Sequence, residues 1–196
     1  MTDYFELFGE RRRPWLQPEV LQEKFLLLSR SVHPDRVHSL SQTERASAQE
    51  RYVQLNAAHQ CLRETRERLR HLLELELGAV PREVRQIPSD LMDLFVEIGK
   101  TLRESDAFLL ENAGVQSPLL EVRRFEMSQH WTEKLLALQQ KVTARREVLV
   151  EELKRLDAEW AGSAGQLRQL EETHHLFSYF DRWLGQIRER LVGLSL

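Results

Sequence analysis

The chain has little of what several classes of protein require. Its 196 residues include a single cysteine, Cys61, which excludes an internal disulfide framework and a thiolate zinc cage. No apolar run approaches the roughly 18 residues that a membrane span needs. Glycine and proline are also scarce, with 8 and 6 residues. This scarcity, together with the high share of Leu, Glu and Arg, favours long helices.

The chain also lacks an excess of charge of one sign. Its 28 Lys and Arg residues stand against 31 Asp and Glu residues, which gives a formal net charge of -3 at pH 7. A protein that binds the phosphate backbone of nucleic acids needs clustered positive charge. The opening MTDYFE shows no basic region followed by an apolar one, as a secretory signal would. We therefore expect no nucleic-acid or membrane partner, and a reducing, cytoplasmic location.

The first part of the chain carries signals for the ends of several helices. A short aromatic helix over residues 3–8 should end at Gly9, because glycine readily takes the left-handed conformation that closes a helix. A second helix should begin near Pro18, which suits the first helical position, and must end before Pro34. The segment Ser41-Gln42-Thr43-Glu44 is a capping box that predicts the start of a third helix.

Apolar stripes predict how these helices pack. The second helix has apolar residues spaced by four, three and four, widened by two more leucines: Leu21, Phe25, Leu28 and Val32, with Leu26 and Leu27 beside them. The third helix has a similar stripe: Ala48, Tyr52, Leu55, Ala58 and Leu62. These two helices should therefore form an antiparallel hairpin. A fourth amphipathic segment over residues 69–77 should end at Gly78, and the arginines that alternate with glutamates before it predict a solvated face: Arg63, Arg66, Arg68 and Arg70.

The loop of the hairpin holds the sharpest motif of the chain, His33-Pro34-Asp35. Proline stiffens the loop, because its ring fixes φ and it has no N–H. The carboxylate of Asp35 can accept charge-assisted hydrogen bonds from an arginine of a partner. Basic side chains beside the motif would steer an acidic partner surface toward it: Lys24, Arg30 and Arg36. The alternative is an ordinary turn, in which Pro34 ends one helix and Asp35 caps the next.

This arrangement resembles the J-domain of DnaJ-type co-chaperones, and the chain is similar to the HscB family, the J-type co-chaperones of iron–sulfur cluster biogenesis. The similarity to HscB lies in Asp3-Tyr4-Phe5-Glu6-Leu7-Phe8-Gly9, Ser41-Gln42, Leu55-Asn56-Ala57-Ala58 and Leu72-Leu73. The resemblance implies that a DnaK-type chaperone, HscA-like, binds the motif and its basic neighbours: His33, Pro34, Asp35, Lys24, Arg30 and Arg36. Eukaryotic members often carry a cysteine-pair zinc segment and a targeting peptide, so their absence implies a bacterial member.

The second half of the chain predicts a separate helical domain. Residues 79–89 are expected to form a linker with two prolines, and Ser89 is expected to cap the helix that follows. Breaks near residues 112–118 and 161–165 separate three helices, which predicts an antiparallel three-helix bundle over residues 90–196. With a J-domain over residues 1–78, the predicted fold is all-α, and the resemblance implies that its two arms are L-shaped.

In the HscB family this bundle binds the iron–sulfur scaffold protein IscU. The resemblance implies a scaffold-binding face that includes apolar residues of the first bundle helix and an aromatic residue of the last: Leu91, Met92, Phe95, and Phe177 or Phe180. The acidic positions of the family's face are occupied here by Val96, Gly99 and Arg103, with Glu97 and Glu104 as their neighbours. The alternative for Leu91, Met92 and Phe95 is the core of the bundle, where most apolar stripes lie.

The predicted function is that of a co-chaperone that is not itself an enzyme. It would stimulate the ATPase of a DnaK-type or HscA-type chaperone and deliver IscU to it for cluster assembly or transfer. The sequence shows no glycine-rich phosphate loop, nucleophile elbow or paired carboxylates, and its histidine spacing offers no metal site, so we expect no cofactor. The alternative is a J-domain co-chaperone for a different client, whose bundle is a general interaction module or forms a weak homo-oligomer.

Overall fold

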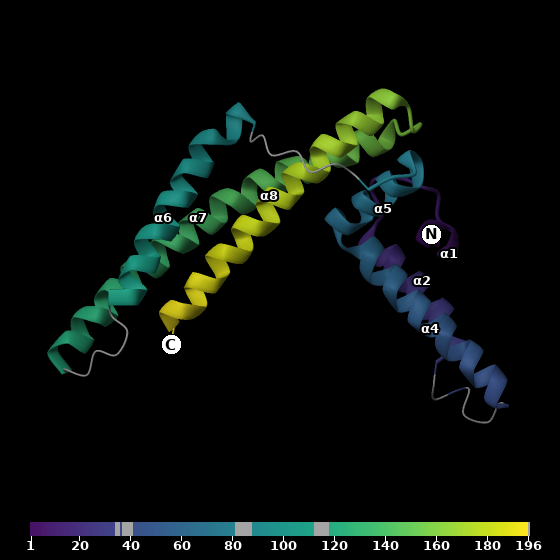
Figure 1. Ribbon diagram of the computed structural model, residues 1–196, viewed down its shortest axis with the longest axis horizontal. Helices are drawn as coiled ribbons and strands as arrows, with labels where there is room; N and C mark the ends of the chain where they lie inside the picture. Colours follow the sequence, from purple (N-terminus) through teal and green to yellow (C-terminus); the bar gives the residue numbers. More distant parts are fainter. Residues whose placement is uncertain (34–35, 37–40, 81–87, 112–117, 196) are drawn as a thin grey trace. The chain divides into compact units, whose positions relative to one another are not determined.

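The computed structural model describes residues 1–33, 36, 41–80, 88–111 and 118–195, without the side chains of 118–121. Within these ranges every regular element is a helix, so the all-α prediction is confirmed (Figure 1). The elements follow one another as α1 (Tyr4–Leu7), α2 (Pro18–Arg30), α4 (Gln42–Arg63), α5 (Thr65–Leu77), the 3-10 helix η1 (Ser89–Leu91), α6 (Met92–Glu111), α7 (Pro118–Ala158) and α8 (Ala164–Ser195).

The chain divides into two compact units. The first unit contains Met1–Arg82 together with Glu151–His174, and the second contains Glu83–Val150 together with His175–Leu196. The end of α7 and the beginning of α8 therefore group with the N-terminal helices. The boundaries expected from the sequence, at residues 78 and 90, remain a prediction.

The helix ends of the first unit follow the capping chemistry that the sequence predicts. Pro18 opens α2. At α1, for which no cap is predicted from the sequence, the Asp3 side chain accepts hydrogen bonds from the backbone N–H groups of Phe5 and Glu6. Ser41 and Glu44 form both halves of the capping box that begins α4. Gly78 closes α5 in the left-handed region, with φ of 67°. Local sequence thus determines where these helices begin and end.

The prediction for Ser89 is wrong in one detail. Ser89 is the first residue of the 3-10 helix η1, whose N-cap is Pro88, and its side chain makes no capping hydrogen bond there. The backbone N–H of Leu91 donates to the Pro88 carbonyl at 3.0 Å. A 3-10 turn satisfies this carbonyl locally, so the chain enters α6 without a side-chain cap.

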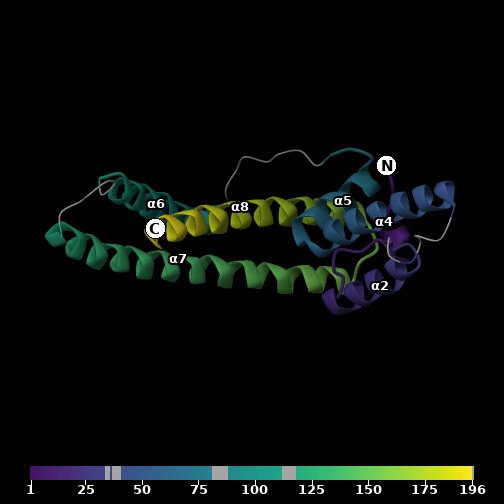
Figure 2. The same cartoon turned by 90° about the horizontal axis from the view of Figure 1, so that it is seen from below.

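The core of the first unit lies where α1, α2 and α5 pack against α4. Fully buried apolar side chains from three of these helices fill it, among them Phe5, Leu55, Leu62, Leu69 and Leu72. Phe25 stacks its ring on His59 at a centroid distance of 4.4 Å, which joins α2 to α4. Figure 2 shows α2 and α4 from a second direction.

Two leucines of α2 do not widen its buried stripe as the sequence suggests. Leu26 and Leu27 are 52% and 67% exposed, whereas Leu21 is buried and Phe25 is half-buried. A helix presents only part of its circumference to a single neighbouring helix, so two leucines next to the stripe point outward.

Arg68 is the third departure from the sequence prediction, since it is buried rather than solvated. Its guanidinium donates to the Pro14 carbonyl at 2.9 Å and to the Leu62 carbonyl at 2.6 Å, and it lies 5.5 Å from the centroid of the Trp15 ring. Burial lowers the pKa of Arg68 to about 10, so the group remains charged at neutral pH. Carbonyl acceptors replace the water that the guanidinium loses.

Asp157, at the end of α7, also binds the loop between α1 and α2, to which Pro14 and Trp15 belong. Its carboxylate is almost completely buried and accepts a bidentate pair of hydrogen bonds from the Arg13 guanidinium. It also accepts the backbone N–H of Trp15 at 2.9 Å. Lys154 lies 4.9 Å from the centroid of the Trp15 ring. These contacts explain why residues 151–174 belong to the first unit.

His71, a residue of α5, holds α1 in place. The ring is buried and stacks on Tyr4, and its Nε2 accepts the backbone N–H of Tyr4 at 3.1 Å. Because this nitrogen is an acceptor, the ring is neutral in the folded protein. Burial is the largest cause that lowers the pKa of His71, and the neighbouring arginines Arg12 and Arg70 lower it further, against the carboxylates of Asp3 and Glu74.

The second unit contains α6 with parts of α7 and α8, packed side by side as a bundle (Figures 1 and 2). Ion pairs Asp90–Arg145, Glu97–Lys141 and Glu104–Lys134 connect residues of rising number in η1 and α6 to residues of falling number in α7. Helices α6 and α7 are therefore antiparallel. The ion pair Arg146–Asp181 and the hydrogen bond from Ser128 to the Leu194 carbonyl show in the same way that α7 and α8 are antiparallel. The predicted antiparallel three-helix bundle is confirmed.

We expect Asp157→Ala to destabilise the first unit by about 2 kcal/mol, because a buried backbone N–H and a guanidinium lose their acceptor together. Asp157→Asn keeps one acceptor oxygen and should cost about half as much. Chemical denaturation followed by the fluorescence of the tryptophans measures both changes. Glu151→Ala is the control on the same helix, because its ion pair with Lys154 is exposed. Equal effects of Asp157→Ala and Glu151→Ala would contradict a structural role for Asp157.

The buried neutral ring of His71 predicts that stability falls in mild acid. The unfolded chain takes up a proton near the ordinary histidine pKa of about 6.5, and the folded chain does so only at lower pH. The unfolded state thus binds more protons between these values, so the free energy of unfolding decreases as pH falls through about 6.5. His71→Gln, whose amide oxygen can accept from Tyr4 without titrating, should flatten this dependence in denaturant titrations. The exposed His130→Gln should leave it unchanged, and an unaltered slope in His71→Gln would disprove the assignment.

Candidate functional site

One candidate site is the hairpin mouth, which we define as Arg30, His33, Arg36 and Tyr52. The ring of His33 meets the edge of Tyr52 of α4, with centroids 5.5 Å apart and an interplanar angle of 82°. The carbonyl of His33 accepts the backbone N–H of Arg36 at 2.9 Å. The beginning of the predicted motif is therefore held by both a ring contact and a backbone hydrogen bond.

Basic residues near the hairpin mouth differ in their exposure to solvent and in whether a carboxylate pairs with them. Arg30, in the last turn of α2, and Arg36 are both exposed. Lys24 is half-buried, and its Nζ lies 2.6 Å from the Glu10 carboxylate. The sequence predicts that Lys24 offers its charge to an acidic partner surface, but this ion pair within the chain offsets much of that charge. Arg30 and Arg36 therefore supply the accessible positive charge on this side of the hairpin.

The two remaining residues of the motif, Pro34 and Asp35, lie outside the described residues. Their predicted roles as a stiff turn and as a hydrogen-bond acceptor stay predictions. The described neighbours on either side, His33 and Arg36, are positioned as given above.

The second candidate site is the α6 face, which we define as Met92, Phe95, Val96, Gly99 and Arg103. These residues recur every three or four positions and so share one side of the helix. Met92, Phe95 and Val96 are 43%, 40% and 58% exposed. Leu91 is 3% exposed and belongs to the core. The structure therefore separates Leu91 from Met92 and Phe95, with which the sequence grouped it.

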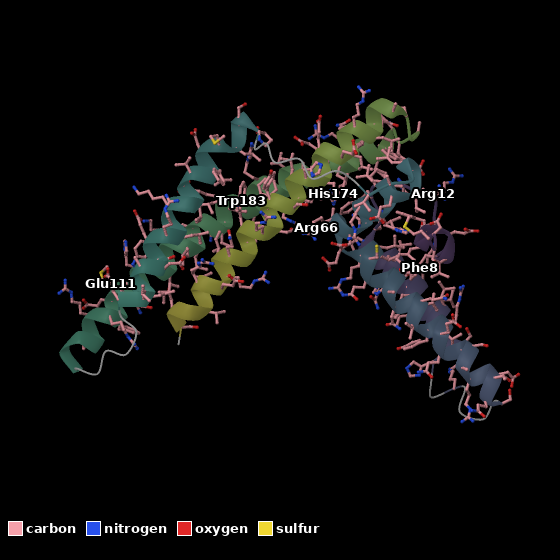
Figure 3. All side chains as sticks on the ribbon, viewed as in Figure 1. Phe8, Arg12, Arg66, Glu111, His174 and Trp183 are labelled. Atoms are coloured by element: carbon pink, nitrogen blue, oxygen red, sulfur yellow. The ribbon has the colours of Figure 1, made fainter. Side chains whose placement is uncertain are left out.

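The two phenylalanines predicted as the aromatic of this face are buried. Phe177 and Phe180 of α8 are 0% and 2% exposed. The α8 side chain that meets Phe95 is Trp183, at a centroid distance of 6.3 Å; Figure 3 labels Trp183 on α8. Sequence reasoning missed Trp183, although it continues the helical spacing of Phe177 and Phe180 and was open to the same argument.

Carboxylates of α6 do not restore an acidic face. Glu97 lies 2.6 Å from the Nζ of Lys141, and Glu104 lies 3.0 Å from the Nζ of Lys134. Both lysines belong to α7, so these carboxylates point toward the neighbouring helix. The hydrogen bond from Lys134 is the largest cause that lowers the pKa of Glu104. The outward positions are those of Val96, Gly99 and Arg103.

The described residues offer little reactive chemistry. Burial raises the pKa of the Cys61 thiol to about 11, so the thiol stays protonated at neutral pH and is a poor nucleophile. Across the described ranges no group of three His, Cys, Asp or Glu side chains is placed to hold a metal ion. None of the helices searched in those ranges is long and apolar enough to span a membrane.

Sequence reasoning also overlooked the residues that fix the loop after α1. Asp157 stands among other charged residues near the end of α7, and Trp15 lies between helices, where apolar periodicity gives no signal. Tyr52 was identified as part of the α4 stripe, but its contact with His33 depends on how α4 meets the hairpin loop. These contacts join residues far apart in the sequence, so spacing alone carries no sign of them.

No protein-family model matches the chain. The chain is 26% identical over 193 residues to a protein described as "Co-chaperone protein HscB homolog" from Vibrio cholerae serotype O1 (strain M66-2). The alignment covers 97% of this chain and 99% of the relative. The similarity therefore extends through both units and is not confined to the hairpin.

Solved structures of two such proteins resemble the present fold. The chaperone HscB from Vibrio cholerae has a TM-score of 0.57 and 26% sequence identity, with 99% of this chain and 96% of that chain covered. Human co-chaperone protein HscB has a TM-score of 0.62 and 20% identity, with 97% and 81% covered. The human structure supports the fold alone, because its sequence identity is low. The sequence and the fold together confirm the resemblance to HscB.

Proposed function

On the premise that the chain is similar to HscB co-chaperones along its whole length, we propose that it is a co-chaperone of a DnaK-type, HscA-like chaperone. The hairpin mouth binds the chaperone and stimulates its ATPase, and the bundle presents a client to it. The client proposed first is an IscU-type iron–sulfur scaffold protein. The chaperone carries out the chemistry, and this chain contributes binding energy.

The position of His33 is the observation that carries this proposal. Its ring contacts Tyr52 and its carbonyl accepts a hydrogen bond from Arg36, so the start of the motif is preorganised before a partner arrives. Preorganisation lowers the entropy that binding costs. Exposed guanidinium groups of Arg30 and Arg36 steer an acidic partner surface toward the mouth and speed its association. We assign a smaller part to Lys24, because Glu10 already neutralises it.

Stimulation of the ATPase follows from differential binding. A co-chaperone shifts its partner toward the state that it binds more tightly, by no more than the difference between the two binding free energies. In the proposed mechanism, Pro34 and Asp35 complete the contact with the hydrolysis-competent state, and Asp35 accepts hydrogen bonds from a chaperone arginine.

A different client is the second candidate for the bundle. The observation in its favour is the α6 face, where Val96, Gly99 and Arg103 occupy the outward positions and Glu97 and Glu104 are held by lysines of α7. This face differs in charge from the acidic one that the resemblance implies. The chaperone partner and the client therefore need separate experiments.

We expect His33→Gln to abolish stimulation of single-turnover ATP hydrolysis by the cognate DnaK-type chaperone. The amide replaces the ring that packs against Tyr52, so the motif loses its preorganisation. His130→Gln is the matched control, because His130 is exposed on α7 and the same substitution there leaves the mouth intact. If no cognate chaperone responds to the unmodified protein, the co-chaperone proposal fails.

Adding the scaffold protein to the same assay tests the client. With IscU present, stimulation by the unmodified protein should rise above the level without IscU, because one chain then brings both partners together. Phe95→Ala should remove this additional stimulation and weaken IscU binding about tenfold, since Phe95 is the aromatic residue on the α6 face. Phe125→Ala is the control, because Phe125 is 63% exposed on α7. Stimulation that IscU does not alter would support the different client.

A further inference from the structure

The α6 face places one guanidinium group beside an exposed apolar patch. Met92, Phe95 and Val96 form the patch, and Arg103 follows Val96 by seven residues, two turns further along the same side of the helix. Lys100 stands at the edge of this side and is exposed. Its Nζ lies 3.9 Å from the Glu104 carboxylate. Arg103 is therefore the one charged residue among the five that define the α6 face.

Carboxylates of α6 are turned toward the other helices of the second unit. Ion pairs hold three of them: Glu97 with Lys141, Glu104 with Lys134, and Asp106 with Arg190. The last of these is bidentate, with both distances at 2.9 Å. Asp93 is exposed, but it lies about 100° around the helix from Met92 and so flanks the face. Intramolecular ion pairs thus engage three of the carboxylates of α6.

Arg103 has no such partner. Within the described part of the chain, no carboxylate comes within ion-pair distance of its guanidinium, and the side chain is exposed. Its Nη1 would lie 3.6 Å from a Cβ placed on Gly99. The arginine therefore extends back along the helix over the glycine. Gly99 weakens a helix interior, but without a Cβ it leaves room for the Arg103 guanidinium beside it.

We propose that the α6 face selects a protein partner whose contact surface combines apolar side chains with carboxylates, and that Arg103 is the residue that sets this preference. This inference rests on the proposed function, since it assigns the chemistry of the client. A partner that covers Met92, Phe95 and Val96 must also desolvate the neighbouring guanidinium. An unpaired buried charge is strongly unfavourable, so the partner has to supply its own carboxylate, which can bind the guanidinium in a bidentate manner. A basic partner surface would be repelled.

The test measures binding of the full chain to an IscU-type scaffold by isothermal titration calorimetry at two salt concentrations. Arg103→Glu should weaken binding about tenfold or more. Arg103→Lys should weaken binding less, because lysine keeps the positive charge but lacks the planar set of N–H donors that binds a carboxylate in a bidentate manner. Arg123→Glu is the matched control on α7, at an exposed arginine outside the face. Circular dichroism of each variant shows that the helices are retained, and unchanged stimulation of the chaperone ATPase without client shows that the hairpin mouth is intact.

A second pair of probes separates this inference from the identity of the client. Two labelled amphipathic peptides share one leucine spacing, and one carries glutamates where the other carries lysines. Fluorescence anisotropy should show tighter binding of the glutamate peptide to the unmodified protein, and Arg103→Glu should reverse the order. If the scaffold does not bind but the peptides behave in this way, the IscU assignment fails and the charge preference stands. Equal binding of both peptides, or scaffold binding that Arg103→Glu leaves intact, would overturn the proposal.

Discussion

The satisfaction of backbone groups by buried polar side chains is the constraint on which the first unit depends. The loop between α1 and α2 contributes Pro14 and Leu16 to the core, and it has no helix to pair its own carbonyl and N–H groups. Arg68 supplies a donor to the Pro14 carbonyl, and Asp157 supplies an acceptor for the Trp15 N–H. Each of these side chains is itself buried, so each would be costly without the loop. The loop and the polar side chains are therefore stable only together.

This arrangement also determines which charged side chains of the hairpin a partner can contact. The loop places Glu10 against Lys24 at 2.6 Å, so a residue that the sequence suggests for partner binding is engaged within the chain. The outward positive charge of α2 then falls to Arg30, beside the exposed Leu26 and Leu27. A similar principle governs α6 in the second unit, where lysines and arginines of α7 and α8 pair with its carboxylates. In both helices, intramolecular pairing decides which charges a partner can meet.

The predictions from sequence succeeded where the signal is local. Helix ends followed from Pro18, Ser41, Glu44 and Gly78, because capping depends on a few adjacent backbone and side-chain groups. The predictions were wrong for Arg68 and left the alternatives open for the apolar residues at the start of α6, because in each case the two alternatives share one local pattern. Alternation of arginine and glutamate is the same whether Arg68 faces water or the Pro14 carbonyl, and apolar spacing is the same whether Leu91 or Met92 is the residue that the bundle buries.

The sequence by itself determined that the chain is helical, where most helices start and stop, and that His33-Pro34-Asp35 follows the second helix. Those features depend on propensity, capping and periodicity, which act over a few residues. The tertiary structure alone decided that Trp183 and not Phe177 or Phe180 meets Phe95. It also decided that Glu97 and Glu104 are engaged while Arg103 remains open. These outcomes depend on which faces of distant helices meet, and only the folded arrangement brings those residues within contact distance.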